Sequence, residues 1–290
     1  MVSTTRCALV FGGSGQVGRA VLARLRGAGW QVVAASREAR TEPGTCWVRA
    51  ELPGAGPVPG RYDAVLSCGP LDHFAEWHAR HGVGVARVVA FGSTSVDAKQ
   101  ASPDAGERAL AQRLAHAEAS LQASAARQGA AVTVLRPTLV YGAGRDMTLT
   151  RIARLARRWG AFPLPRNATG LRQPVHVDDL GAAAVAALGA PATHGRAYAL
   201  PGGETLPYRE MVARVLTVLD PRPRLVPVPS AAFRVAVALA RPAGLARGFG
   251  PGAAARLHED LVFDAGPAAR DFGYAPRGFV PIAATFRPAA

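Results

Sequence analysis

Three glycines near the N-terminus have the spacing of a loop that binds phosphate. Gly12, Gly15 and Gly18 lie three residues apart and follow the apolar run Ala8–Phe11. The first glycine permits a tight turn, the second allows the backbone to approach a pyrophosphate, and the third lets a helix pack closely on the strand. The helix after the loop presents N–H groups and a partial positive charge to the phosphates. The alternative is a glycine-rich turn without a ligand. The residues expected to hold a dinucleotide are Gly12, Gly13, Ser14, Gly15, Gln16, Val17 and Gly18.

The end of the next expected strand, residues 30–36, indicates which dinucleotide binds. In folds that bind dinucleotides, an acidic residue at the end of this strand holds the ribose 2′-hydroxyl of NAD, whereas an arginine accommodates the 2′-phosphate of NADP. Here the strand ends in Ser36 and Arg37, and the first carboxylate is that of Glu38. Arg37 therefore favours NADP, with NAD as the alternative. An ordinary surface arginine in an arginine-rich chain is the other interpretation.

Strands and helices alternate around this loop, which predicts a parallel sheet. Apolar runs indicate strands at 30–36, 46–50, 62–68, 87–91 and 131–135. Helical spacing of apolar residues predicts helices at 16–28 and 104–127, and a further helix with several histidines before residue 87. The expected fold is α/β: a Rossmann-type, doubly wound parallel sheet with a small C-terminal α/β lobe.

The second half of the chain is less regular. We expect helices at 151–159, 207–219, 230–240 and 251–261, a helix that ends at Leu188, and one more strand at 197–200. The domain organisation that follows is a dinucleotide-binding domain over residues 1–165 and a smaller, partly interleaved lobe over 166–290. A segment at about 175–200 is expected to return to the first domain.

Composition limits the classes of partner. The chain has 290 residues, of which 49% are hydrophobic, and a formal charge of +14. Lys99 is the only lysine, so 33 of the 34 basic residues are arginine. The arginines are spread along the chain without the aromatic interleaving that is typical of nucleic-acid binding. A small-molecule substrate, anionic like the cofactor, is the expected partner.

The cysteines and histidines do not form a metal-binding pattern. Cys7, Cys46 and Cys68 contain no C-x-x-C pair, and no histidine joins them at ligand spacing. No apolar run approaches the length that spans a membrane, and no secretory signal precedes the first strand. We therefore expect a cytoplasmic protein that uses no metal.

Three motifs, at these distances and in this order, are similar to those of a known family. They are Phe11–Gly18, Leu135–Gly142 and Arg172–Leu180, and Asp271–Pro276 closes the pattern. With them the chain resembles the NAD(P)-dependent epimerase/dehydratase branch of the extended short-chain dehydrogenase/reductase superfamily. The resemblance covers nearly the whole chain and is specific to the superfamily, not to a substrate.

The resemblance implies roles for further residues. Glu51 and Leu52 take the place of an acidic and an apolar residue that contact the adenine. Ser93, with Thr94 beside it, matches the serine or threonine that binds substrate beside the nicotinamide. The remaining implied contacts are Arg136 and Pro137 along the nicotinamide, and Arg172, which in nucleotide-sugar epimerases holds a substrate phosphate.

The catalytic pair of the superfamily is missing. Its members carry Tyr-x-x-x-Lys, in which the lysine lowers the pKa of the tyrosine. When Glu118 is aligned with the glutamate that follows this pair, Leu110 and Leu114 stand at the two positions. The chain thus resembles an atypical member of the superfamily.

Few side chains could replace the pair. Ser93 and Thr94 lie at the right strand end but do not titrate near neutrality. Tyr141 and His176 could approach the pocket from the second lobe, and His176 has a suitable pKa. A packing tyrosine and a structural histidine are the alternatives. The catalytic candidates are therefore Ser93, Tyr141 and His176.

Two functions remain open. One is an NADP-dependent oxidoreductase or epimerase/dehydratase-like enzyme that acts on a carbonyl or nucleotide-sugar-like substrate. The other is a non-catalytic NAD(P)-binding protein with a structural or redox-sensing role. Loss of the tyrosine and lysine favours the second function, and the retained Arg172 motif favours the first.

Overall fold

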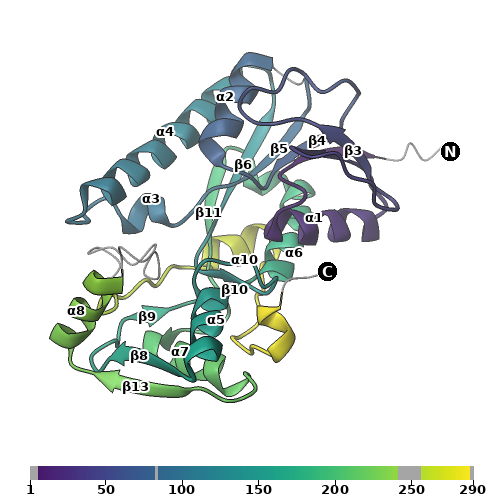
Figure 1. The fold of residues 1–290 in the computed structure, drawn as a ribbon. Coiled ribbons are helices and arrows are strands. Elements are labelled where there is room, and N and C mark those ends of the chain that lie inside the picture. Colours follow the sequence, from purple (N-terminus) through teal and green to yellow (C-terminus); the bar gives the residue numbers. More distant parts are fainter. Residues whose placement is uncertain (1–5, 82–83, 241–255, 288–290) are drawn as a thin grey trace.

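A parallel sheet forms the first half of the molecule. The computed structural model describes residues 6–81, 84–240 and 256–287. Within these residues, seven parallel strands are joined in the order β11-β6-β5-β4-β1-β2-β3 (Figure 1). The predicted Rossmann-type fold is confirmed. The strands are β1 (Cys7–Phe11), β2 (Gln31–Ser36), β3 (Cys46–Arg49), β4 (Ala64–Ser67), β5 (Arg87–Phe91), β6 (Ala131–Pro137) and β11 (Arg196–Leu200).

Helices cover both faces of this sheet (Figure 1). Along β1, Ala8 and Val10 pack into one apolar cluster while Leu9 and Phe11 pack into another, as the alternation of a strand requires. The first cluster includes residues of α1 (Gln16–Gly27) and α6 (Val177–Leu188), and the second includes residues of α2 (Leu71–His81) and α4 (Ala105–Arg127). Burial on both faces explains why the strands read as continuous apolar runs.

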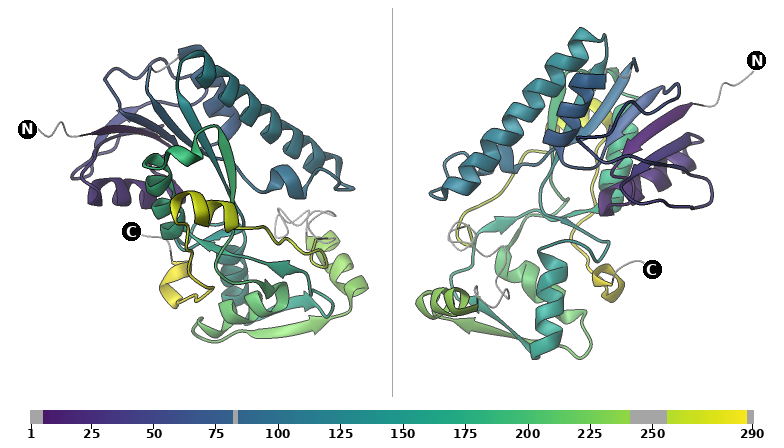
Figure 2. Two further views of the ribbon diagram at one scale, coloured as in Figure 1. Left: turned by 180° about the vertical axis from the view of Figure 1, so that it is seen from behind. Right: turned by 45° about the horizontal axis from the view of Figure 1, so that its top comes forward.

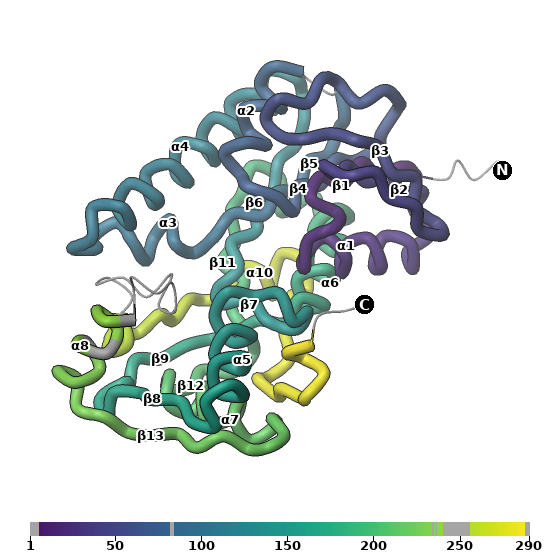
Figure 3. The backbone as a smooth tube through the Cα atoms, viewed as in Figure 1, coloured from purple at the N-terminus to yellow at the C-terminus, as the bar shows by residue number. Residues whose placement is uncertain are grey.

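A second lobe with its own apolar core lies beyond one end of the sheet (Figure 2). It begins where β6 leaves the sheet, and the chain returns through α6 to β11, which pairs with β6 (Figure 3). The division into domains at residue 165 stays a prediction. The remaining elements are α3 (Ser95–Ala98), β7 (Val140–Tyr141), α5 (Leu149–Trp159), β8 (Ala161–Pro165), β9 (Leu171–Arg172), β10 (Val175–His176), η1 (Pro191–Thr193), β12 (Leu206–Pro207), α7 (Tyr208–Thr217), β13 (Arg224–Val228), α8 (Ser230–Ala240), α10 (Gly266–Phe272) and η2 (Ala283–Phe286).

The helix predicted at 251–261 is wrong over residues 256–261, which form turns, bends and irregular chain. Residues 251–255 lie outside the described residues. Part of the backbone of this segment bonds to residues 170 and 171. Gly170 N–H donates to the Leu257 carbonyl at 3.0 Å, and Leu261 N–H donates to the Leu171 carbonyl at 3.0 Å. These long-range bonds replace the i to i−4 bonds that a helix needs.

Candidate functional site

The glycine loop joins β1 to α1 as a tight turn. Gly12 has φ +71°, a conformation that side-chain-bearing residues rarely adopt. A Cβ on Gly18 would lie 2.1 Å from the Gly12 carbonyl oxygen, so only glycine lets the helix approach the turn this closely. The N-cap residue Gly15 supplies no side-chain hydrogen bond, and the first turn of α1 contains no acidic residue. The positive N-terminal end of α1 is therefore open to an anionic ligand.

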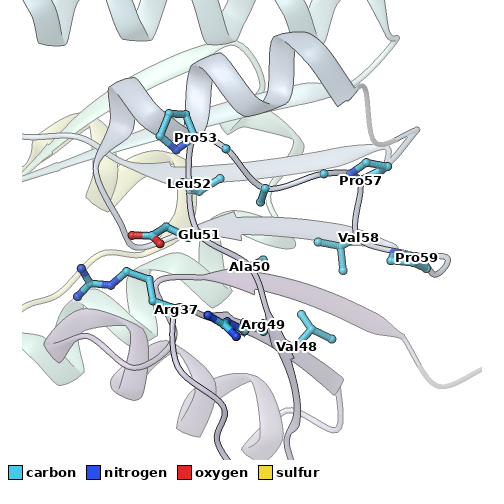
Figure 4. A pocket seen from close by; sticks show the side chains of 13 residues that line it. Arg37, Val48, Arg49, Ala50, Glu51, Leu52, Pro53, Pro57, Val58 and Pro59 are labelled. Atoms are coloured by element: carbon cyan, nitrogen blue, oxygen red, sulfur yellow. The ribbon is translucent and has the colours of Figure 1, made fainter.

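A cavity of about 730 Å³ lies past the ends of β2 and β3 (Figure 4). Arg37, Glu51 and Leu52, the three residues expected at the adenosine end of the cofactor, all line it. Figure 4 shows Arg37 and Glu51 at the same end of the cavity, with the loop from Pro53 to Pro59 along its other wall. The cavity thus brings together Arg37, predicted from its position at a strand end, and Glu51 and Leu52, to which the family resemblance assigns the adenine.

Arg40 is a second cation at this end of β2, and it was missed in the sequence. Its Nε donates to Ser36 Oγ at 3.3 Å, its guanidinium lies 5.8 Å from the Trp47 ring centroid, and Glu38 pairs with it at 3.4 Å. The spacing Ser-Arg-x-x-Arg over residues 36–40 is the signal that could have indicated it. Arg40 is thus held beside the end of β2, three residues after Arg37.

The ends of β5 and β6 bring the predicted nicotinamide residues together. Thr94 donates from both its N–H and its hydroxyl to the Pro137 carbonyl, each at 3.2 Å. The Ser95 N–H donates to Ser93 Oγ at 3.1 Å. Because that bond uses Ser93 Oγ as an acceptor, its hydroxyl hydrogen stays available to a substrate oxygen. Arg136 points instead to carboxylates, donating to Glu118 at 2.9 Å and to Asp97 at 3.2 Å.

Tyr141 and His176 lie beside each other on the paired strands β7 and β10. Their ring centroids are 5.1 Å apart at an interplanar angle of 80°. Tyr141 is fully buried, and burial raises its pKa to about 12. His176 Nδ1 accepts the Asp178 N–H at 3.2 Å and caps α6, while burial lowers the pKa of its imidazole. At neutral pH the imidazole is therefore uncharged, with its hydrogen on Nε2.

Arg172 does not face an open site. It is 5% exposed, and its guanidinium donates to the carbonyls of Leu171 at 2.6 Å and Glu259 at 2.8 Å, and also to that of Arg256. Tyr208 lies under the guanidinium, 5.4 Å from its ring centroid. This arginine binds the segment of residues 256–259 to β9.

The described residues hold no group of three or more His, Cys, Asp or Glu side chains that could bind a metal ion. Across the same part of the chain, every helix is too short or too polar to cross a membrane.

The sequence is similar to a family model and to a named reductase. Residues 72–200 match the model of the NAD dependent epimerase/dehydratase family. A 2-alkyl-3-oxoalkanoate reductase of Stenotrophomonas maltophilia (strain K279a) is 31% identical over 189 residues. That match covers 61% of this chain and 54% of the relative, so it spans about half of the relative's length.

Solved structures share the fold at low identity. The epimerase Mth375 of Methanothermobacter thermautotrophicus is 15% identical, with a TM-score of 0.71 over 97% of this chain and 90% of that one. MoeE5, solved in complex with UDP-glucose and NAD, is 19% identical, with a TM-score of 0.69 over 94% of each chain. The match over residues 72–200 makes this part of the chain similar to the NAD dependent epimerase/dehydratase family, and the solved structures share its fold.

Proposed function

We propose that this chain is an NADP-dependent oxidoreductase that acts on the carbonyl group of a small, anionic substrate. The position of two features supports binding of the cofactor. The uncapped N-terminus of α1 and the cavity lined by Arg37 lie at neighbouring strand ends, where the pyrophosphate and the adenosine of one dinucleotide would bind. The carbonyl part is supported by the Stenotrophomonas relative, which is named a reductase of a 3-oxo acid. Epimerase or dehydratase chemistry would begin from the same kind of site. The cytoplasmic location stays a prediction.

In this proposal the residues of the two strand ends orient the reactants. When bound, the cofactor supplies a hydride to the carbonyl carbon. Pro137 and the backbone after β6 pass the nicotinamide, and Thr94 fixes that backbone through its two hydrogen bonds. Ser93 donates its hydroxyl hydrogen to the substrate oxygen, where negative charge develops. His176 is the second-lobe side chain proposed to exchange a proton with that oxygen, and the fully buried Tyr141 packs beside its ring.

A non-catalytic dinucleotide-binding protein is the second candidate. Leu110 and Leu114 on α4 occupy the two positions of the missing pair, and both are half-buried apolar side chains. Neither can exchange a proton. A nucleotide-sugar substrate has less support, because the guanidinium of Arg172 is bonded to backbone carbonyls.

Turnover separates the two candidates. We expect NADPH oxidation with 3-oxoalkanoates, and a loss of kcat of about 100-fold in Ser93→Ala, because one donor to the developing oxyanion is removed. His176→Asn preserves the helix cap and removes the imidazole, so it tests proton exchange without disturbing α6. An unchanged kcat in that variant would limit His176 to capping. Tight NADPH binding without turnover on 3-oxo acids, simple ketones or nucleotide-sugars would favour the non-catalytic candidate.

Arg37 is expected to select the cofactor. Replacing it with alanine should weaken NADPH binding about tenfold or more and leave NADH binding unchanged, because only NADPH carries the 2′-phosphate. The measurement is a fluorescence titration of both cofactors. Arg24→Ala is the matched control, since Arg24 is an exposed arginine on α1 outside the cavity. Equal affinities for NADPH and NADH that Arg37→Ala does not change would contradict the preference for NADP.

A further inference from the structure

Lys99 is the only lysine in a chain that otherwise uses arginine for its basic side chains. It caps the C-terminus of α3, and its N–H donates to the Ser95 carbonyl at 3.2 Å. One helical turn, roughly 6 Å, therefore separates it from the residues next to Ser93. Figure 1 shows α3 and the start of α4 on the side of the sheet half that faces the second lobe. Lys99 thus ends the short helix that follows Ser93 in the chain.

Lys99 shares one carboxylate with an arginine of the second lobe. Its Nζ lies 3.6 Å from Glu107 Oε1, and the Arg256 guanidinium donates to Glu107 Oε2, which also accepts the Ser102 hydroxyl at 2.8 Å. The three charged side chains are 20%, 15% and 18% exposed for Lys99, Glu107 and Arg256. Two cations on one carboxylate leave a positive charge in excess at the boundary between the lobes.

The carboxylate in this cluster is ionised at neutral pH. Burial acts to raise the pKa of Glu107, but hydrogen bonds from Arg256 and Ser102 outweigh it and hold the pKa below its ordinary value. The charges of Lys99 and Arg256 also act in that direction. The cluster is therefore a fixed arrangement of two positive charges and one negative charge. Lys99 retains ammonium donors beyond the one directed at Glu107, since an ammonium carries three.

Arg172 holds Arg256 in this position. Its guanidinium donates to the Arg256 and Glu259 carbonyls, so it fixes the backbone on which Arg256 stands. In nucleotide-sugar epimerases, the family resemblance assigns the arginine at this position to a substrate phosphate. Here that guanidinium is bonded internally, and the cation presented between the lobes belongs to Arg256.

We infer that Lys99 and Arg256 bind an oxyanion of the substrate, a carboxylate or a phosphate, while Glu107 holds the two cations together. The inference rests on the proposed function, because it places the reacting carbonyl at Ser93. It assigns an anion site to the boundary between the two lobes, in place of the one expected at Arg172. Neutral carbonyl compounds of the same size are then poor ligands.

Binding of unreactive anions tests this site apart from turnover. The probes are 3-hydroxydecanoate against its methyl ester, and UDP against uridine, measured by calorimetry with and without NADPH. We expect one or both anions to bind at least about tenfold more tightly than the matched neutral compound. Lys99→Gln and Arg256→Gln should each lose about tenfold in that affinity, whereas Lys99→Arg should retain it. The anion whose affinity falls in the glutamine variants shows whether the site binds a carboxylate or a diphosphate.

The control is Arg113→Gln, which removes an arginine of α4 outside this cluster, whose partner is Asp72 at 3.1 Å. It should leave anion binding unchanged, and circular dichroism should show that all variants are folded. Equal binding of acids and esters, or anion affinities that neither glutamine variant changes, would overturn the inference. Because NADPH affinity is measured in the same experiments, loss of cofactor binding would be seen separately as failure of the proposed function.

Discussion

Gly18→Ala is expected to lower NADPH affinity by about 100-fold and the free energy of unfolding by about 3 kcal/mol. The added Cβ would lie 2.1 Å from the Gly12 carbonyl oxygen and 2.7 Å from the Gly13 Cα. Both neighbours are backbone atoms, so either α1 or the loop must move. A shift of this kind separates the loop N–H groups from the pyrophosphate that they are proposed to hold. Urea unfolding and a fluorescence titration with NADPH measure the two effects.

Gly27→Ala makes the same change in the same helix and serves as the control. A Cβ on Gly27 has no atom within 4 Å, and the residue is exposed. Alanine should therefore raise stability by up to about 1 kcal/mol, because it is the better helix former, and leave NADPH affinity unchanged. If Gly18→Ala behaves like Gly27→Ala, the close packing of helix on loop has no role in binding.

The fold was predictable because local sequence determines most of it. Glycine spacing gave the turn and the close packing at Gly18, and apolar runs gave the strands of the sheet within a few residues. The segment 256–261 was not predictable, because its backbone is bonded to residues 170–172, far away in the sequence. Helical propensity describes only near neighbours, so it gives no warning of such a competing partner.

The site shows the same limit. Arg37 was identified by its position at a strand end, Glu51 and Leu52 by the family resemblance, and all three line one cavity. Arg172 has the residue type and position of a phosphate ligand, yet its guanidinium is directed at carbonyls of the C-terminal segment. The contact between Glu107 and Arg256 joins residues 149 positions apart, and no local pattern indicates it. Motifs locate backbone positions, while the direction of a long side chain depends on what packs around it.

Trp77→Ala is expected to destabilise the protein by about 4 kcal/mol and to weaken NADPH binding. Trp77 is fully buried on α2, where its ring centroid lies 4.5 Å from that of Phe11. Its Nε1 donates to the Gly56 carbonyl at 3.1 Å, and Gly56 lines the cavity at the adenosine end of the site. The indole therefore fills the core beneath the sheet and also anchors the loop that forms one cavity wall. Urea unfolding and the NADPH titration again provide the measurements.

Two further variants separate these roles of Trp77. Trp77→Phe retains a ring in the core but loses the bond to Gly56, so it should cost about 1 kcal/mol while NADPH affinity still falls several-fold. Trp159→Ala is the control for loss of an indole, because Trp159 is 48% exposed at the end of α5, and it should change neither quantity measurably. An NADPH affinity in Trp77→Phe equal to that of the unaltered protein would show that the bond to Gly56 does not position the cavity wall. The wall would then depend on the remaining contacts of residues 53–59, and the cofactor effect of Trp77→Ala would follow from loss of core packing alone.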